Sequence, residues 1–198
     1  MRILFVHGIN QDPGEPFDKL WVDELRGAGL PCEGVGARWP STGSFIGDVI
    51  KFMTPTFKAD ADEAVCHALL DFARAGGGVV LSHSMGTVLA INAERLVRTG
   101  LQMVCLASPL SNPAVLQALL AIGYGREPAE PIIHLWNDDD PIPGGKHAQQ
   151  PSYFKASRIA VASNEAKAFA SEHDVRAYLR HQHTVNALRV VASRSITS

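Results

Sequence analysis

Residues 79–87 read Val79-Val80-Leu81-Ser82-His83-Ser84-Met85-Gly86-Thr87. The apolar start predicts a short buried strand, and the apolar periodicity of residues 85–98 predicts a helix. Ser84 would then lie on the strained turn between them, with its hydroxyl lifted above the sheet. Ser82 and Gly86 have the small side chains that such a turn needs, because backbone passes close to both. The stretch therefore predicts Ser84 as a nucleophile; the alternative is that Ser84 only caps the helix.

Short apolar runs alternate with helical patterns on both sides of this turn. We expect strands over residues 2–6, 33–39, 79–81, 101–106, 132–136 and 158–162. We expect helices over residues 17–26, 60–75, 85–98, 113–122 and 175–191, with Asp60 and Asn112 as caps. This alternation predicts an α/β fold: a doubly wound, mostly parallel sheet of about six strands with helices on both faces. In such sheets the chemistry lies beyond the carboxyl ends of the strands.

Length and composition favour one globular domain over residues 1–198. Hydrophobic residues make up 46% of the chain and charged residues 19%, which allows one sizeable core. The net charge of −2 and the scattered basic residues give no reason to expect nucleic acid or a membrane as a partner. Three cysteines without motif spacing favour buried thiols over disulfides. No apolar segment has the signature of a signal peptide or a bilayer span, so we expect a cytoplasmic protein.

The start of the helix after Ser84 supplies a second chemical group. Backbone N–H donors are unpaired at a helix N-terminus, where the helix dipole is positive. The N–H of Met85 could therefore stabilise the oxyanion that forms when Ser84 attacks a carbonyl group.

A second segment, Val6-His7-Gly8-Ile9-Asn10, follows the first expected strand. Together with the serine turn, it resembles the α/β-hydrolase superfamily in its small esterase and lipase branch. The stretch Arg38-Trp39-Pro40-Ser41-Thr42-Gly43 is similar to a Trp-Pro-Ser stretch in some bacterial hydrolases. The resemblance implies that Ile9 gives a second oxyanion N–H and that His7 holds this loop. Ser82 stands where many members have glycine, a substitution that the superfamily tolerates.

The resemblance also implies a chain order of serine, acid and histidine. A serine hydroxyl needs a base, and the base needs an anion to orient it. After the expected strand at 132–136 comes Asn137-Asp138-Asp139-Asp140-Pro141-Ile142-Pro143. The family pattern of Asp, any residue, an aliphatic residue and often Pro fits Asp140, and Pro141 favours an extended backbone there. Asp138 is the alternative acid, and the three carboxylates could also form a solvated turn or a cation site.

The candidate base is His173, which lies just before the last expected helix. This segment resembles hydrolase tails in which the catalytic histidine is followed shortly by an aromatic residue; here that residue is Tyr178. His147, in the connection over residues 144–154, is the alternative base. His181 and His183 fall within the last expected helix, where a solvated face is the simpler interpretation.

These residues predict a serine hydrolase that cleaves small-molecule carboxylic esters of small or medium acyl groups through an acyl-enzyme, with no cofactor and no metal. Thioester or amide hydrolysis and acyl transfer use the same groups, and a non-catalytic binding module could keep the same fold. No Gly-rich nucleotide-binding motif is present in the sequence. The apolar segment 42–58 is either a helix packed on the sheet or a wall of the acyl site, and 144–154 could line its mouth.

Overall fold

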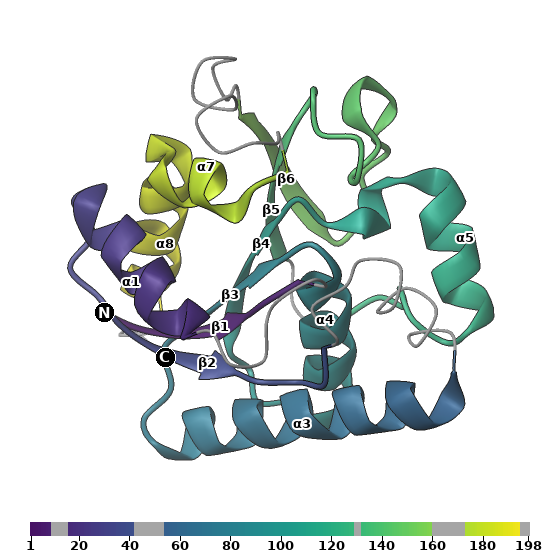
Figure 1. The fold of residues 1–198 in the computed structure, drawn as a ribbon, viewed down its shortest axis with the longest axis horizontal. Coiled ribbons are helices and arrows are strands. Elements are labelled where there is room, and N and C mark those ends of the chain that lie inside the picture. The colour runs from purple at the N-terminus through teal and green to yellow at the C-terminus, as the bar shows by residue number, and fades with distance from the viewer. Residues whose placement is uncertain (9–15, 42–53, 129–131, 160–172, 195–198) are drawn as a thin grey trace.

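A computed structural model describes residues 1–8, 16–41, 54–128, 132–159 and 173–194 of the chain. Its centre is a parallel sheet of six strands in the order β2-β1-β3-β4-β5-β6 (Figure 1). The strands are β1 (Arg2–Val6), β2 (Glu33–Ala37), β3 (Val79–His83), β4 (Gln102–Leu106), β5 (Ile132–Asn137) and β6 (Phe154–Ile159). Every neighbouring pair runs parallel, so the carboxyl ends of all six strands lie at one edge of the sheet.

Helices cover both faces of this sheet (Figure 1). One face carries α1 (Phe17–Gly27), α7 (Val175–Arg180) and α8 (Gln182–Arg194). The other carries α3 (Pro55–Arg74), α4 (Met85–Val97) and α5 (Pro113–Ala121). Two short 3-10 helices, η1 (Pro109–Ser111) and η2 (Gly145–His147), lie in the connections. This arrangement confirms the predicted fold class.

The apolar runs of the strands have a direct cause in this layering. Successive side chains of a strand point to opposite faces, and both faces of this sheet are covered. Ile3 and Phe5 therefore enter the core beside α1, whereas Leu4 and Val6 enter the core beside α3 and α4. A strand buried on both faces must be apolar at nearly every position, which is the pattern that the sequence shows.

Two elements begin several residues earlier than the sequence predicts. The helix expected from residue 60 begins at Pro55, so Asp60 lies inside α3 and does not cap it. A proline is favoured at the first helical position, and Phe57 already packs against the core. The strand expected from residue 158 begins at Phe154, where pairing with Ile132 of β5 starts. The cap at Asn112 is confirmed, since its side chain accepts from the N–H groups of Ala114 and Val115.

The helix expected over residues 175–191 is two helices. His181 lies between α7 and α8 in an extended conformation, with φ −71° and ψ 132°. The Thr184 hydroxyl donates to the backbone carbonyl of Tyr178 across this break. His181 and His183 therefore do not share one helix: His183 is an exposed residue of α8.

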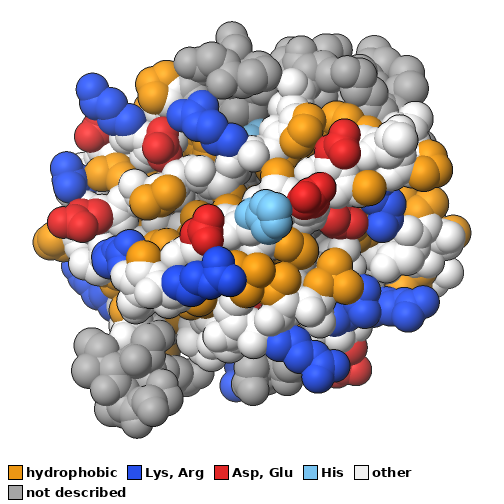
Figure 2. Space-filling model, turned by 90° about the horizontal axis from the view of Figure 1, so that it is seen from below, with side chains coloured by type: hydrophobic (Ala, Val, Ile, Leu, Met, Phe, Trp, Pro, Cys, Tyr) orange, Lys and Arg blue, Asp and Glu red, His pale blue; other side chains and the backbone are white. Residues whose placement is uncertain are grey.

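The outer surface of α3 is mixed in character. Lysine, arginine and acidic side chains are interspersed on the face seen from below, with apolar side chains between them (Figure 2). Among the helices in the described ranges, none combines the length and the apolar run that crossing a membrane requires.

Candidate active site

Ser84 lies on a strained turn between two regular elements. Strand β3 ends at His83 and helix α4 begins at Met85, so Ser84 alone makes the turn, with φ 54° and ψ −130°. Positive φ is uncommon for a residue other than glycine and persists only where the surroundings hold it. The Ser84 N–H donates to the carbonyl of Leu106 at 2.9 Å, which ties the turn to the end of β4. The Ser84 side chain makes no capping hydrogen bond to α4, so the helix-cap alternative is wrong.

The backbone is closely packed around this turn. A β-carbon at Gly8 would lie 2.9 Å from the Ser84 β-carbon, so the chain after β1 passes directly over the serine. Ser82 is fully buried, and its hydroxyl donates to the Cys105 thiol at 3.3 Å. The small residues around Ser84 thus leave room for neighbouring backbone and strands, as the sequence pattern requires.

His173 contacts both Ser84 and Asp140. Its Nε2 lies 2.8 Å from the Ser84 hydroxyl oxygen, and its Nδ1 lies 2.8 Å from Oδ2 of Asp140. A charged carboxylate can only accept, so Nδ1 carries the proton and Nε2 is free to accept from Ser84. The histidine comes just before α7, whose first turn is capped by the side chain of Asp174.

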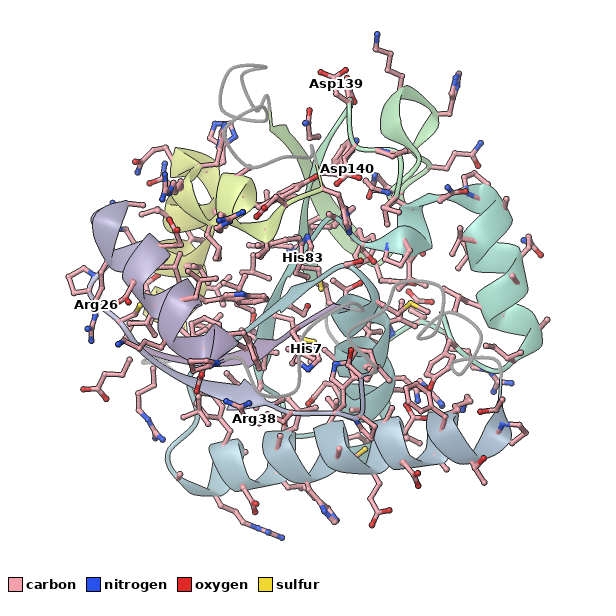
Figure 3. The ribbon with its side chains drawn as sticks, in the orientation of Figure 1. His7, Arg26, Arg38, His83, Asp139 and Asp140 are labelled. Atoms are coloured by element: carbon pink, nitrogen blue, oxygen red, sulfur yellow. The ribbon has the colours of Figure 1, made fainter. Side chains whose placement is uncertain are left out.

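The three adjacent aspartates have different environments. The Asp140 side chain is 0% exposed, and its Oδ1 accepts from the Ile142 N–H at 2.9 Å. Asp138 is half-buried and Asp139 is exposed. Figure 3 shows Asp139 at the outer end of this loop and Asp140 closer to the sheet. Of the three, Asp140 is the one whose carboxylate meets a histidine.

Tyr178 contacts the Asp140 carboxylate, a role that the sequence did not indicate. Its hydroxyl oxygen accepts from the Asn137 N–H at 3.1 Å, and its proton is donated to Oδ2 of Asp140 at 2.7 Å. Burial, followed by the charge of Asp140, raises the pKa of Tyr178, so the group stays a neutral donor. The aromatic position after the histidine was the only signal for it in the sequence.

Two other histidines help to shape the site. The His83 ring is buried, with its centroid 4.6 Å from that of His173. Burial, and then the neighbouring His173, lowers the pKa of His83 well below 6.5, so His83 is a neutral packing residue. His7 bonds the Gly8 carbonyl through Nδ1 at 2.6 Å and stacks on Trp39, whose indole N–H donates to the His7 carbonyl.

A series of hydrogen-bonded polar groups, buried as far as His134, leads from the Ser84 carbonyl to Gln150. The Thr87 hydroxyl oxygen lies 2.7 Å from the Ser84 carbonyl oxygen and 2.7 Å from Oγ of Ser108. The Ser108 N–H donates to Nε2 of His134 at 2.9 Å, so the proton of this ring is on Nδ1, which lies 2.7 Å from Oε1 of Gln150. Burial lowers the pKa of His134 to about 4, so this ring is neutral at ordinary pH.

The other expected site residues are placed less completely. Met85 opens α4, with its N–H in the unpaired first turn. Ile9, the second expected oxyanion donor, lies outside the described residues, as do residues 42–53 of the apolar segment.

His147, the alternative base, is an exposed residue of η2 that lines a pocket of about 500 Å³ together with Asn112, Asp138, Asp139 and Lys146. Within the described ranges, no three His, Cys, Asp or Glu side chains gather as metal ligands would.

The order of the elements around Ser84 decides the fold. A central parallel strand, β3, runs directly into a strained serine and then a helix, with an aspartate after a later strand and a histidine before the last helices. The chain has a minimal α/β-hydrolase fold. The predicted resemblance to that superfamily is confirmed at the level of the fold.

Comparison with known proteins finds distant structural neighbours. No family model matches the sequence, and no curated protein matches it. One similar structure is described as a hydrolase of the α/β superfamily from Xanthomonas campestris pv. campestris. It is 12% identical, with 96% of this chain and 98% of that chain covered and a TM-score of 0.47. Another is the RedJ thioesterase of prodiginine biosynthesis in Streptomyces coelicolor, at 16% identity, 99% and 89% coverage and a TM-score of 0.45.

Proposed function

We propose that this protein is a serine hydrolase that cleaves small-molecule carboxylic esters with small or medium acyl groups. One observation carries the proposal: His173 lies 2.8 Å from both the Ser84 hydroxyl oxygen and the Asp140 carboxylate. A base between a hydroxyl group and an oriented anion is the arrangement that activates a serine for attack on a carbonyl carbon.

The reaction would begin with proton transfer from Ser84 to Nε2 of His173. The serine oxygen forms a bond to the ester carbon, while the Asp140 carboxylate holds the imidazole tautomer and stabilises the imidazolium. The Met85 N–H, at the positive end of α4, would donate to the oxyanion, with Ile9 as the proposed second donor. The oxyanion then collapses, the bond from the carbonyl carbon to the alcohol oxygen breaks, and His173 gives its proton to that oxygen, which leaves the acyl group on Ser84.

Water would complete the cycle with His173 again as the base. The water oxygen forms a bond to the acyl carbon while its proton passes to Nε2. The bond from that carbon to the Ser84 oxygen then breaks, Nε2 returns the proton to the serine oxygen, and the acid is released. The proton transfers of both half-reactions pass through His173, so the proposed reaction uses no cofactor. Thioester and amide bonds, and acyl transfer to an alcohol, would use the same atoms. The preference for small or medium acyl groups rests on the sequence, in which no internal connection is long enough to form a lid domain.

The proposal is tested by labelling with a fluorophosphonate probe and by a panel of esters of graded acyl length, with thioesters in parallel. We expect the wild-type chain to be labelled at Ser84 and to hydrolyse short esters fastest. The Ser84→Ala variant should lose labelling and lower kcat by about 10⁶. A hydrolysis rate that jumps once the concentration of a long-chain ester exceeds its critical micellar concentration would contradict the size preference. No labelling of the folded wild type and no hydrolysis would favour a non-catalytic binding module.

A further inference from the structure

We propose that Tyr178 is a positioning residue of this site: its hydroxyl group fixes the Asp140 carboxylate and limits how strongly that carboxylate holds the proton of His173. The inference rests on the proposed function, since it assigns a role within the same three-residue arrangement.

The direction of each hydrogen bond at Tyr178 is determined by its partners. A backbone N–H can only donate, so the phenolic oxygen accepts from Asn137, and the phenolic proton is left for Oδ2 of Asp140, 2.7 Å away. The same Oδ2 lies 2.8 Å from Nδ1 of His173. Tyr178 and His173 therefore share one carboxylate oxygen, whereas the other oxygen accepts from Ile142.

The tyrosine is held rigidly. Its ring is fully buried in the core that the strands share with α1 and α8, and its backbone carbonyl accepts from the Thr184 hydroxyl at 2.7 Å. His173 lies on the same segment, just before α7. One short segment thus carries both the expected base, His173, and the hydroxyl group that holds the expected acid. The positions of His173 and Tyr178 at Asp140 are therefore fixed relative to each other.

The shared oxygen has an electrostatic consequence. Asp140 is removed from water, so its charge depends on the donors around it. The hydrogen bond from the phenol partly offsets the negative charge on Oδ2, and this weakens the attraction of the carboxylate for the imidazolium of His173. Among the described residues, the Ser84 hydroxyl and the neutral His83 ring also contact His173, and neither is charged. Without the phenol, the carboxylate would hold the proton of His173 more tightly. As the pH is lowered, His173 would then become protonated, and stop acting as a base, at a higher pH than in the wild type.

Tyr178→Phe removes this hydroxyl with little change of shape. We expect kcat for a short ester to fall by about 10- to 100-fold, with KM within about threefold. We expect the acid limb of the kcat/KM profile to move to higher pH by about half a unit to one unit. A loss of folded protein alone would lower activity without moving that limb.

The chain contains a closely matched control. Tyr124 is also fully buried, and its hydroxyl donates to Oδ1 of Asp62 at 3.0 Å, away from Ser84. Tyr124→Phe also removes a hydrogen bond from tyrosine to a carboxylate, so it should lower stability by a similar amount but leave the acid limb in place. Tyr153→Phe, which removes a bond to the Gly125 carbonyl, is a second control.

A measurement independent of activity follows the His173 imidazole by NMR through a pH titration, with His173→Gln used for assignment. The titration midpoint should rise in Tyr178→Phe. In the double variant Tyr124→Phe, Tyr153→Phe, Tyr178 is the one remaining tyrosine and can be replaced by 3-fluorotyrosine. The fluorinated phenol is a stronger hydrogen-bond donor with nearly the same shape, so the titration midpoint of His173 should then fall. Unchanged midpoints in both variants overturn the proposal. If the wild type is inactive, the proposed function fails, whereas the titration still decides the role of Tyr178.

Discussion

Gly86 lies directly against the backbone carbonyl of His7. A β-carbon at Gly86 would come within 2.2 Å of the His7 oxygen and 2.4 Å of the Val6 oxygen. Both contacts are with backbone at the end of β1, which cannot move without disturbing the sheet. The first turn of α4 therefore packs on β1 only because residue 86 has no side chain.

We expect Gly86→Ala to lower the free energy of unfolding by about 1–3 kcal/mol, because even one methyl group overpacks this contact. Urea unfolding of the purified chain measures this. Gly27→Ala is the control, since a β-carbon there meets nothing within 4 Å. Equal stability of the two variants would show that the contact between α4 and β1 yields easily.

The three aspartates should differ sharply in their effect on rate. Asp140→Asn replaces an acceptor of the His173 Nδ1 proton with an amide that can stabilise the wrong tautomer, and kcat should fall by about 10⁴. Asp138→Asn and Asp139→Asn should each stay within about tenfold of wild type, because the hydrogen bond to Nδ1 of His173 comes from Asp140. Steady-state kinetics on one short ester compares all three. A larger loss in Asp138→Asn than in Asp140→Asn would transfer the acid role to Asp138.

Replacement of the proposed base should remove both hydrolysis and probe labelling. His173→Gln should lower kcat by about 10⁴ or more, because the serine hydroxyl loses its proton acceptor and the two groups act as one unit. His147→Gln is the matched control, since His147 is exposed in η2. If His147→Gln abolishes activity and His173→Gln does not, the base lies in the connection between β5 and β6.

Stability should fall in mild acid because of His134. Burial lowers the pKa of this ring from 6.5 to about 4 in the folded chain, partly opposed by Gln150 and Asp140. Between these two values the unfolded chain binds the proton and the folded chain does not. The stability contributed by the neutral ring is therefore complete above about pH 6.5 and lost as the pH falls toward 4, by about 3 kcal/mol in total.

This loss can be measured as the free energy of unfolding in urea at pH 7, 6, 5 and 4. His134→Gln should be less stable at pH 7 but should show a flatter dependence on pH. The slope that remains would come from other groups, among them His83, whose lowered pKa acts in the same direction. His147→Gln should keep the wild-type slope. Parallel curves for His134→Gln and wild type would rule out His134 as the source.

Features that depend on near neighbours in the chain were predictable. The order of strands and helices follows from periodicity, because strands covered on both faces must be apolar throughout. Asn112 caps α5 through bonds to residues two and three positions ahead, which any sequence with Asn-Pro at that place can make. The turn at Ser84 is also local, since it needs a strand, a serine, small neighbours and a helix start.

The break at His181 could not be predicted in this way. Val175, Tyr178, Leu179, Val185 and Leu188 face the core on both sides of it, so the apolar pattern reads as one helix. What separates α7 from α8 is tertiary packing, of α7 mainly against α1 and of α8 against β3 and β4, together with the bond from Thr184 to the Tyr178 carbonyl. The early start of α3 at Pro55 also depends on tertiary structure, because the first turn of the helix brings Phe57 into contact with the core.

The sequence by itself determined a parallel α/β sheet with a serine at its central turn, and it narrowed the candidate acid and the candidate base to a few residues each. Only the tertiary structure decided that Asp140, and not Asp138 or Asp139, meets His173, and that Tyr178 shares the same carboxylate oxygen. The physical reason is distance along the chain. A hydrogen bond between His173 and Ser84, 89 positions apart, depends on how β3, β5 and α7 pack together, and no local pattern of residues encodes that packing.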